Sequence, residues 1–203
     1  MWQITHFSRP HKGEDVAHGL KLSPNRWGVV LADGAGGLSG GWRAAARTVD
    51  TLIGQLEDDP ANTATGIARW METVDNALVK DKKAGEAAAI TLVVDEQGVR
   101  GAQAGNVAAW AMANGQVTRL DVTDRKIPRL GTKLCLPAPL SLSGHIDAVL
   151  LLSAGAWGPL GGELTQAVAA ALSQALEGDA STALPTLVRA GSDDSTGILL
   201  VRR

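Results

Sequence analysis

The residues best suited to chemistry are carboxylates at the ends of predicted strands. Residues 27–37 predict a buried strand that ends in Asp33 and is followed at once by a glycine turn. A carboxylate in that position is costly unless a cation meets it. Because Gly34 lets the main chain approach a ligand closely, the Asp33 oxygens and the Gly34 carbonyl could hold one hard cation together.

Two further acidic pairs lie far from Asp33 in the chain. Glu14-Asp15 lies near the N-terminus, and Asp193-Asp194 precedes a final apolar strand. These groups offer only oxygen donors, which are the ligands that Mg²⁺ and Mn²⁺ prefer. The acids at three predicted strand boundaries therefore indicate a metal site suited to phosphate chemistry.

Composition limits the classes of protein that this chain can represent. Its 203 residues, 45% of them hydrophobic, predict a single domain over residues 1–203 with a sizeable core. A net charge of −2 argues against nucleic acid or an anionic membrane as a partner. Cys135 is the sole cysteine, which excludes an internal disulfide and fits a reducing compartment. With no signal-peptide pattern and no run of about 20 apolar residues, we expect a cytoplasmic protein outside the membrane.

The hydrophobic periodicity predicts a mixture of strands and helices. Strands are expected over 2–7, 15–22, 26–32, 88–94, 100–104, 107–113, 117–120, 146–153 and 198–201, and helices over 42–56, 67–78, 164–176 and 183–190. Asn62 or Thr63 is expected to cap the second helix, and Asn114-Gly115 marks a hairpin. Residues 121–145 are polar and contain prolines, so they are interpreted as a surface loop. This order predicts a layered α+β fold.

The glycine loop after Asp33 allows other interpretations. It resembles a dinucleotide fingerprint, but Asp33 would repel a pyrophosphate, and a ribose-binding acid on a second strand is missing. Ser39 lies between glycines as in a nucleophile elbow, with Asp124 and His145 as partners, yet it stands too far beyond the strand. Asp33 could also simply cap the next helix, which leaves the other acidic pairs unexplained.

The motifs, taken in order, resemble those of the metal-dependent protein phosphatases of the type-2C serine/threonine family. The matching segments are Arg9 with Glu14-Asp15, Asp33-Gly34-Ala35-Gly36-Gly37, Ala104-Gly105-Asn106-Val107, Leu130-Gly131, residues 147–155 and Asp193-Asp194-Ser195. Together they cover nearly the whole chain. The resemblance implies a central β-sandwich flanked by helices, an α-β-β-α arrangement.

The resemblance also implies a chemistry and a role for each matched residue. One or two Mn²⁺ or Mg²⁺ ions would activate a water that attacks the phosphorus of phosphoserine or phosphothreonine. Asp33 would bridge the ions, Glu14 and the Gly34 carbonyl would hold one ion, and Asp194 the other. Asp15 would orient metal-bound water, and Arg9 would bind the substrate phosphate. The implied partners are a phosphorylated protein substrate and a cognate Ser/Thr kinase, and the chain is expected to be a monomer.

The chain also departs from that family pattern. Ala154 replaces an aspartate that would be a direct metal ligand, and Asn106 replaces one that serves an additional, weaker ion. Gly13 stands where the pattern has asparagine, and Ala35 where some relatives place a histidine, which leaves His11 as a candidate general acid.

Two functional hypotheses follow from these matches and departures. One is a working phosphatase, and the other is a pseudophosphatase that binds a partner without turnover. The short stretch 131–146 further implies that the mobile flap near the family's active site is truncated.

Overall fold

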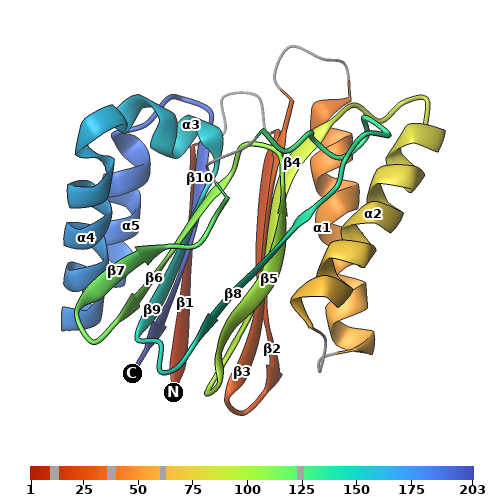
Figure 1. Ribbon diagram of the computed structural model, residues 1–203. Helices are drawn as coiled ribbons and strands as arrows, with labels where there is room; N and C mark the ends of the chain where they lie inside the picture. Colours follow the sequence, from red (N-terminus) through yellow and green to blue (C-terminus); the bar gives the residue numbers. More distant parts are fainter. Residues whose placement is uncertain (10–13, 36–39, 60–62, 123–125) are drawn as a thin grey trace.

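Two five-stranded antiparallel sheets lie face to face, with helices on both outer faces (Figure 1). The computed structural model describes residues 1–9, 14–35, 40–59, 63–122 and 126–203. The first sheet has the order β1-β10-β9-β6-β7, with bounds Trp2–Arg9, Ser195–Arg202, Ala148–Leu152, Ala108–Ala113 and Gln116–Arg119. The second has the order β2-β3-β4-β5-β8, with bounds Asp15–Ser23, Arg26–Gly34, Ala87–Asp95, Gly98–Ala104 and Ala138–Ser143.

The helices cover the outer faces of this sandwich in two groups (Figure 1). On the second sheet lie α1 (Gly41–Asp58) and α2 (Ala64–Lys80). On the first sheet lie α4 (Leu164–Gln174) and α5 (Ala180–Arg189), while the short helix α3 (Ala154–Trp157) follows β9 directly. The predicted α+β sandwich with an α-β-β-α layer order is therefore confirmed.

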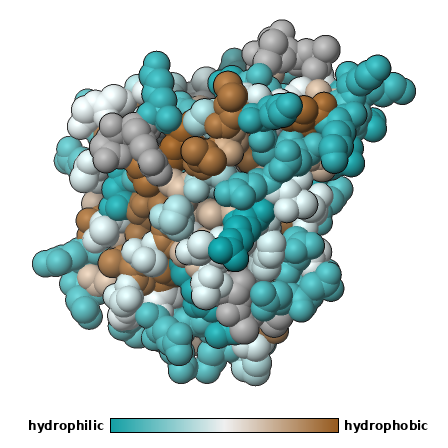
Figure 2. All heavy atoms as spheres, turned by 45° about the vertical axis from the view of Figure 1, so that its right-hand side comes forward, coloured by the Kyte–Doolittle hydropathy of each residue, from teal (hydrophilic) through white to brown (hydrophobic). Residues whose placement is uncertain are grey.

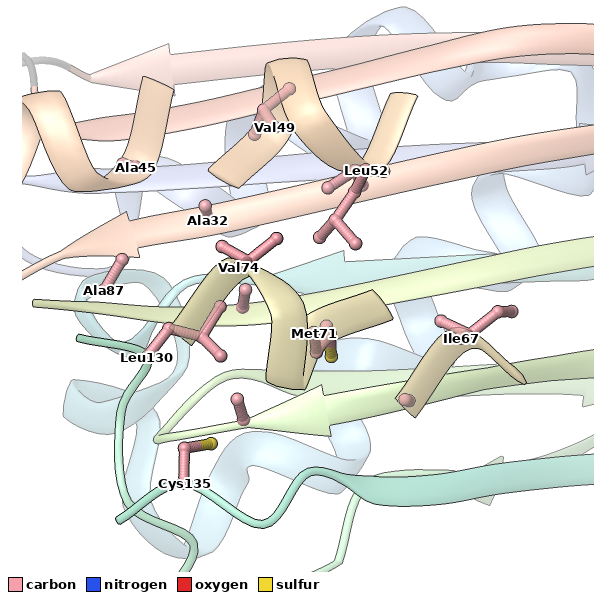
Figure 3. Packing of buried hydrophobic residues seen from close by; sticks show 14 of the residues in the cluster. Ala32, Ala45, Val49, Leu52, Ile67, Met71, Val74, Ala87, Leu130 and Cys135 are labelled. Atoms are coloured by element: carbon pink, nitrogen blue, oxygen red, sulfur yellow. The ribbon is translucent and has the colours of Figure 1, made fainter. Parts of the chain in front are cut away.

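Buried apolar side chains form three layers that match this architecture. One lies between the two sheets, one beneath α4 and α5, and one beneath α1 and α2. Figure 3 shows this last layer, in which Val49 and Leu52 of α1 and Met71 of α2 lie against strands of the second sheet. Each fully buried side chain of this size contributes about 1.5–3 kcal/mol. The helices thereby fix the sheet that carries Asp33.

Local sequence signals set several element boundaries as expected. The Thr63 side chain accepts a hydrogen bond from Gly66 N at 3.1 Å and caps α2, while Asn62 lies outside the described residues. Asn114 and Gly115 have φ values of 50° and 76°, which suit the tight turn that joins β6 to β7.

The prediction of a continuous loop over 121–145 is wrong, because β8 lies within it and pairs with β5. Ala138 and Leu140 are buried while Pro139 and Ser141, which follow them in turn, are exposed, which is the alternation of a strand with one covered face. Proline is tolerated there because β8 is the edge strand of its sheet. Helix α3 was also not predicted, since four residues are too few to show a helical period.

The surface carries isolated apolar side chains among hydrophilic ones (Figure 2). Apolar atoms reach the face shown there as separate groups. Among the described residues, the exposed large apolar side chains are Met1, Trp42, Val79, Leu134 and Leu136. Within the same residues, every helix is too short or too polar to cross a bilayer.

Candidate metal centre

Four carboxylates from both sheets gather at one end of the sandwich. Asp15 and Asp33 are direct partners in the register of β2 and β3, and Glu14 precedes β2. Asp194 directly precedes β10, whose first residue pairs with the last residue of β1. We call Glu14, Asp15, Asp33 and Asp194 the acidic centre.

The main chain around Gly34 leaves no room for a side chain. Gly34 N donates a hydrogen bond to Glu14 O at 3.1 Å. A Cβ at Gly34 would lie 2.6 Å from the carbonyl carbon and oxygen of Gly41 and 2.8 Å from Glu14 O. The glycine therefore allows the end of β3, the start of α1 and Glu14 to meet, which brings two of the acids together.

The carboxylates of the acidic centre repel one another when they are ionised. Burial, and then the charges of Asp33 and Asp194, raise the pKa of Asp15 to about 8, while the neighbouring Ser153 and Thr196 side chains act to lower it. The pKa of Asp33 is raised to about 6, first by burial and then by Asp194 and Glu14. Adjacent like charges on paired strands destabilise a sheet unless a cation compensates them.

The donor set fits a hard cation. One oxygen each of Glu14, Asp15 and Asp194 is buried and has no hydrogen-bond partner among the described residues. Buried acceptors of this kind cost free energy until a cation or a donor satisfies them. Among the described residues, no group of three or more His, Cys, Asp or Glu side chains is arranged so that it could hold a metal ion by itself. Mg²⁺-type ions bridge such gaps because they keep several of their own waters.

Ala154 lies between two members of the acidic centre. Its main-chain N donates a hydrogen bond of 2.8 Å to Asp33 Oδ2. The next residue, Gly155, packs so closely on Asp194 that a Cβ there would overlap the main-chain oxygen of Asp194. Helix α3 therefore contributes an N–H to this point, where the phosphatase motif has a carboxylate.

The guanidinium of Arg9 is held at the edge of the acidic centre. It donates hydrogen bonds to Asp193 Oδ1 and, at 2.9 Å, to the main-chain oxygen of Arg189. Asp193 is thus an ion-pair partner of Arg9, while its neighbour Asp194 belongs to the acidic centre. The Arg9 side chain remains 32% exposed, so one side of it still faces solvent.

Arg129 is a cation near the centre that sequence reasoning missed. Its charge lowers the pKa of Asp33, against the upward shifts from burial and from the other acids. Hydrogen bonds of 2.9 and 3.1 Å between Leu130 and Ala87 fix this segment beside β4. The Leu130-Gly131 motif next to Arg129 was the available signal, but a motif match does not indicate where the preceding side chain lies.

The alternative interpretations of the glycine loop fare differently. The β2-β3-β4 strands are antiparallel, which contradicts the parallel βαβ unit that a dinucleotide site requires. For the nucleophile elbow, His145 forms an ion pair with Asp147 just before β9 begins. Ala154, which bonds to Asp33 of the acidic centre, follows the other end of β9, so His145 and the acidic centre lie at opposite ends of that strand. The predictions on Gly13, His11, Gly36, Gly37, Ser39 and Asp124 lie outside the described residues.

The two-sheet sandwich flanked by helices matches the fold of bacterial serine/threonine phosphatases of the type-2C kind. The chain resembles a bacterial serine phosphatase, with a TM-score of 0.79 and 16% identity over 99% of this chain and 97% of the other. It resembles serine/threonine phosphatase Stp1 from Staphylococcus aureus with a TM-score of 0.73 and 16% identity, over 100% and 95% of the two chains.

A third similar structure is the catalytic domain of serine threonine protein phosphatase PstP in complex with two manganese ions. Its TM-score is 0.75 and its identity 14%, over 98% of this chain and 96% of the other. No family model matches the sequence, and no curated protein matches it. The chain therefore has the type-2C phosphatase fold at low sequence identity.

Proposed function

We propose that this protein is a metal-dependent protein serine/threonine phosphatase. The observation that carries the proposal is the acidic centre, in which three buried carboxylate oxygens have no partner among the described residues. The fold shared with bacterial serine/threonine phosphatases supports the same conclusion. The substrate would be a phosphorylated protein, modified by a cognate Ser/Thr kinase.

The residues of the acidic centre would hold one or two Mn²⁺ or Mg²⁺ ions. Asp33, Glu14, the Gly34 carbonyl and Asp194 are the proposed ligands, in agreement with a solved phosphatase of this fold that binds two manganese ions. When bound, the metal supplies an activated water and charge stabilisation for phosphate hydrolysis.

The chain's own side chains prepare the remaining parts of the reaction. Asp15 lies opposite Asp33 in the register of β2 and β3, and the neighbouring Ser153 and Thr196 side chains act to lower its pKa, so its carboxylate would be available to orient a metal-bound water. Arg9 is partly exposed and anchored by Asp193, which positions its guanidinium to bind a substrate phosphate at the rim. The Ala154 N–H holds one Asp33 oxygen in place.

A catalytically impaired binding module is the second candidate function. It is favoured by Ala154, which offers an N–H where the phosphatase motif supplies a carboxylate ligand. Losing one anionic ligand weakens a Mg²⁺-type site, because these ions depend on charged oxygen donors. Such a module would bind phosphorylated partners without hydrolysing them.

Hydrolysis of p-nitrophenyl phosphate separates the two candidates. We expect turnover that requires millimolar Mn²⁺ or Mg²⁺, disappears with EDTA and is lost in Asp33→Asn. Asp50→Asn is the matched control, because Asp50 is an exposed acid on α1. A folded wild-type protein with no metal-dependent turnover would refute the enzyme and favour the binding module.

A further inference from the structure

A cavity of about 860 Å³ opens beside the acidic centre. Its walls come from the end of β5 and its connection to β6, the end of β7, residues 121–122 and 126–129, and Trp157 of α3. Of the described residues, three cationic side chains line it, Arg119, Lys126 and Arg129, together with one acid, Asp121. We call this cavity the basic pocket.

Among the described residues, the cationic side chains of the basic pocket outnumber the acidic one. The Asp121 carboxylate is already engaged, because it accepts hydrogen bonds of 2.9–3.0 Å from Arg119 Nε and Nη2 and one of 3.0 Å from Ala109 N. Lys126 has no ion-pair partner among the described residues, and Arg129 has a single distant one, Glu86 at 3.7 Å. Within the described part of the chain, the Lys126 ammonium is therefore left for an incoming anion, and the Arg129 guanidinium is only loosely engaged.

The rest of the wall is fixed before any ligand arrives. The Arg119 guanidinium lies 5.3 Å from the ring centre of Trp110 and 5.1 Å from that of Trp157. The buried Gln103 amide donates to the carbonyls of Gly105 and Val107 and accepts from Val122 N at 2.8 Å. A preformed wall of this kind lowers the entropic cost of binding.

The basic pocket and the acidic centre share two structural neighbours. Arg129 lines the pocket and acts electrostatically on Asp33. Helix α3 begins at Ala154, which bonds to Asp33, and ends at Trp157 in the pocket wall, a rise of about 4.5 Å along the helix. An extended peptide rises about 3.3 Å per residue, so a side chain two or three residues from a bound phosphoserine could reach a wall that begins one helical turn from Ala154.

We propose that the basic pocket binds an acidic side chain of the phosphopeptide substrate, two or three residues away from the phosphorylated one. The inference rests on the proposed function and names the substrate class of that same site. Lys126 and Arg129 supply the charge, while the Trp157 ring covers the aliphatic part of a glutamate side chain. The protein would then favour phosphorylated segments that carry acidic neighbours.

The test compares phosphopeptides that differ by one Glu→Gln change at the second or third position on either side of phosphoserine. For the wild-type protein with Mn²⁺, we expect kcat/KM to be roughly fivefold higher for the Glu peptide at one of these positions, as for a partly exposed charge-assisted contact. Lys126→Gln should bring this ratio close to one. The ratio is taken within each variant, so a general effect on turnover cancels.

Lys21→Gln is the matched control, because Lys21 is an exposed lysine six residues along β2 from Asp15, about 20 Å away. The control should keep the wild-type ratio. A wild-type ratio near one at every position, with turnover intact, would overturn the pocket inference and leave the proposed function standing. An equal drop in Lys21→Gln would also overturn it, since net charge would then explain the preference.

Binding separates failure of the pocket from failure of catalysis. Fluorescence anisotropy of labelled Glu and Gln phosphopeptides is measured on wild type and on Lys126→Gln, with the catalytically disabled Asp33→Asn protein as a third sample. If no sample turns over substrate, a binding preference for the Glu peptide that Lys126→Gln abolishes still supports the pocket. Equal binding of both peptides to the wild-type protein refutes it.

Discussion

Replacing Asp15 by asparagine should stabilise the metal-free protein at neutral and alkaline pH. Burial, and then the charges of Asp33 and Asp194, raise the pKa of Asp15 to about 8. A carboxyl whose pKa is raised by folding favours the folded state most at low pH. This contribution is lost as the pH rises from the ordinary value of 3.8 toward 8. Asparagine keeps the shape of the side chain and removes the charge.

The size of the effect follows from the pKa shift. Each pKa unit corresponds to about 1.4 kcal/mol, and at pH 7 only the roughly three units between 3.8 and 7 count, which sets a ceiling of about 4 kcal/mol for the penalty. Asp33 shares this penalty, because its own pKa is raised to about 6. In EDTA at pH 8, we therefore expect the free energy of unfolding of Asp15→Asn to exceed that of wild type by roughly 2 kcal/mol.

Urea unfolding followed by tryptophan fluorescence measures this free energy in EDTA at pH 5.5 and pH 8. Wild type should lose stability between these pH values, and Asp15→Asn should lose less. The control Asp50→Asn, at an exposed position of α1, should follow wild type. Adding Mn²⁺ at pH 8 should stabilise wild type more than the variant. If Asp15→Asn in EDTA is less stable than wild type at pH 8, charge repulsion does not determine the stability of the metal-free acidic centre.

Three further outcomes follow from the same geometry. Ala154→Asp should raise the Mn²⁺-induced shift in Tm and the rate of aryl phosphate hydrolysis, and it should lower Tm in EDTA. The reason is that the new carboxylate joins Asp33 and Asp194. A variant that is less stable in both conditions and no more active would contradict this. Gly34→Ala should lower the free energy of unfolding by more than about 3 kcal/mol in urea titrations, since its Cβ would meet backbone atoms at 2.6 Å; Gly54→Ala, at an open position, is the control. Native Cys135 should resist a thiol-specific disulfide reagent at pH 8, because burial raises its pKa to about 12, and should react fully in urea; rapid labelling of the native protein would refute this.

Short-range patterns predicted most elements of the fold correctly. The run before Asp33, the period of α1 and the Asn114-Gly115 turn each depend on residues close together in the chain. The signal failed where the long-range partner decides the structure. Strand β8 is short and contains Pro139, which hides its alternation within a proline-bearing stretch, and it becomes a strand because β5 offers its free edge.

The sequence by itself determined which acids the protein has and that they stand at strand ends, because strand boundaries and residue chemistry are local properties. Only the tertiary structure decided that Asp15 pairs with Asp33, that Ala154 N–H bonds to Asp33, and that the Arg129 charge acts on Asp33. These contacts join residues as many as 121 positions apart. They exist because two sheets, each anchored by its own helices, bring their strand ends together, and no local pattern encodes that juxtaposition.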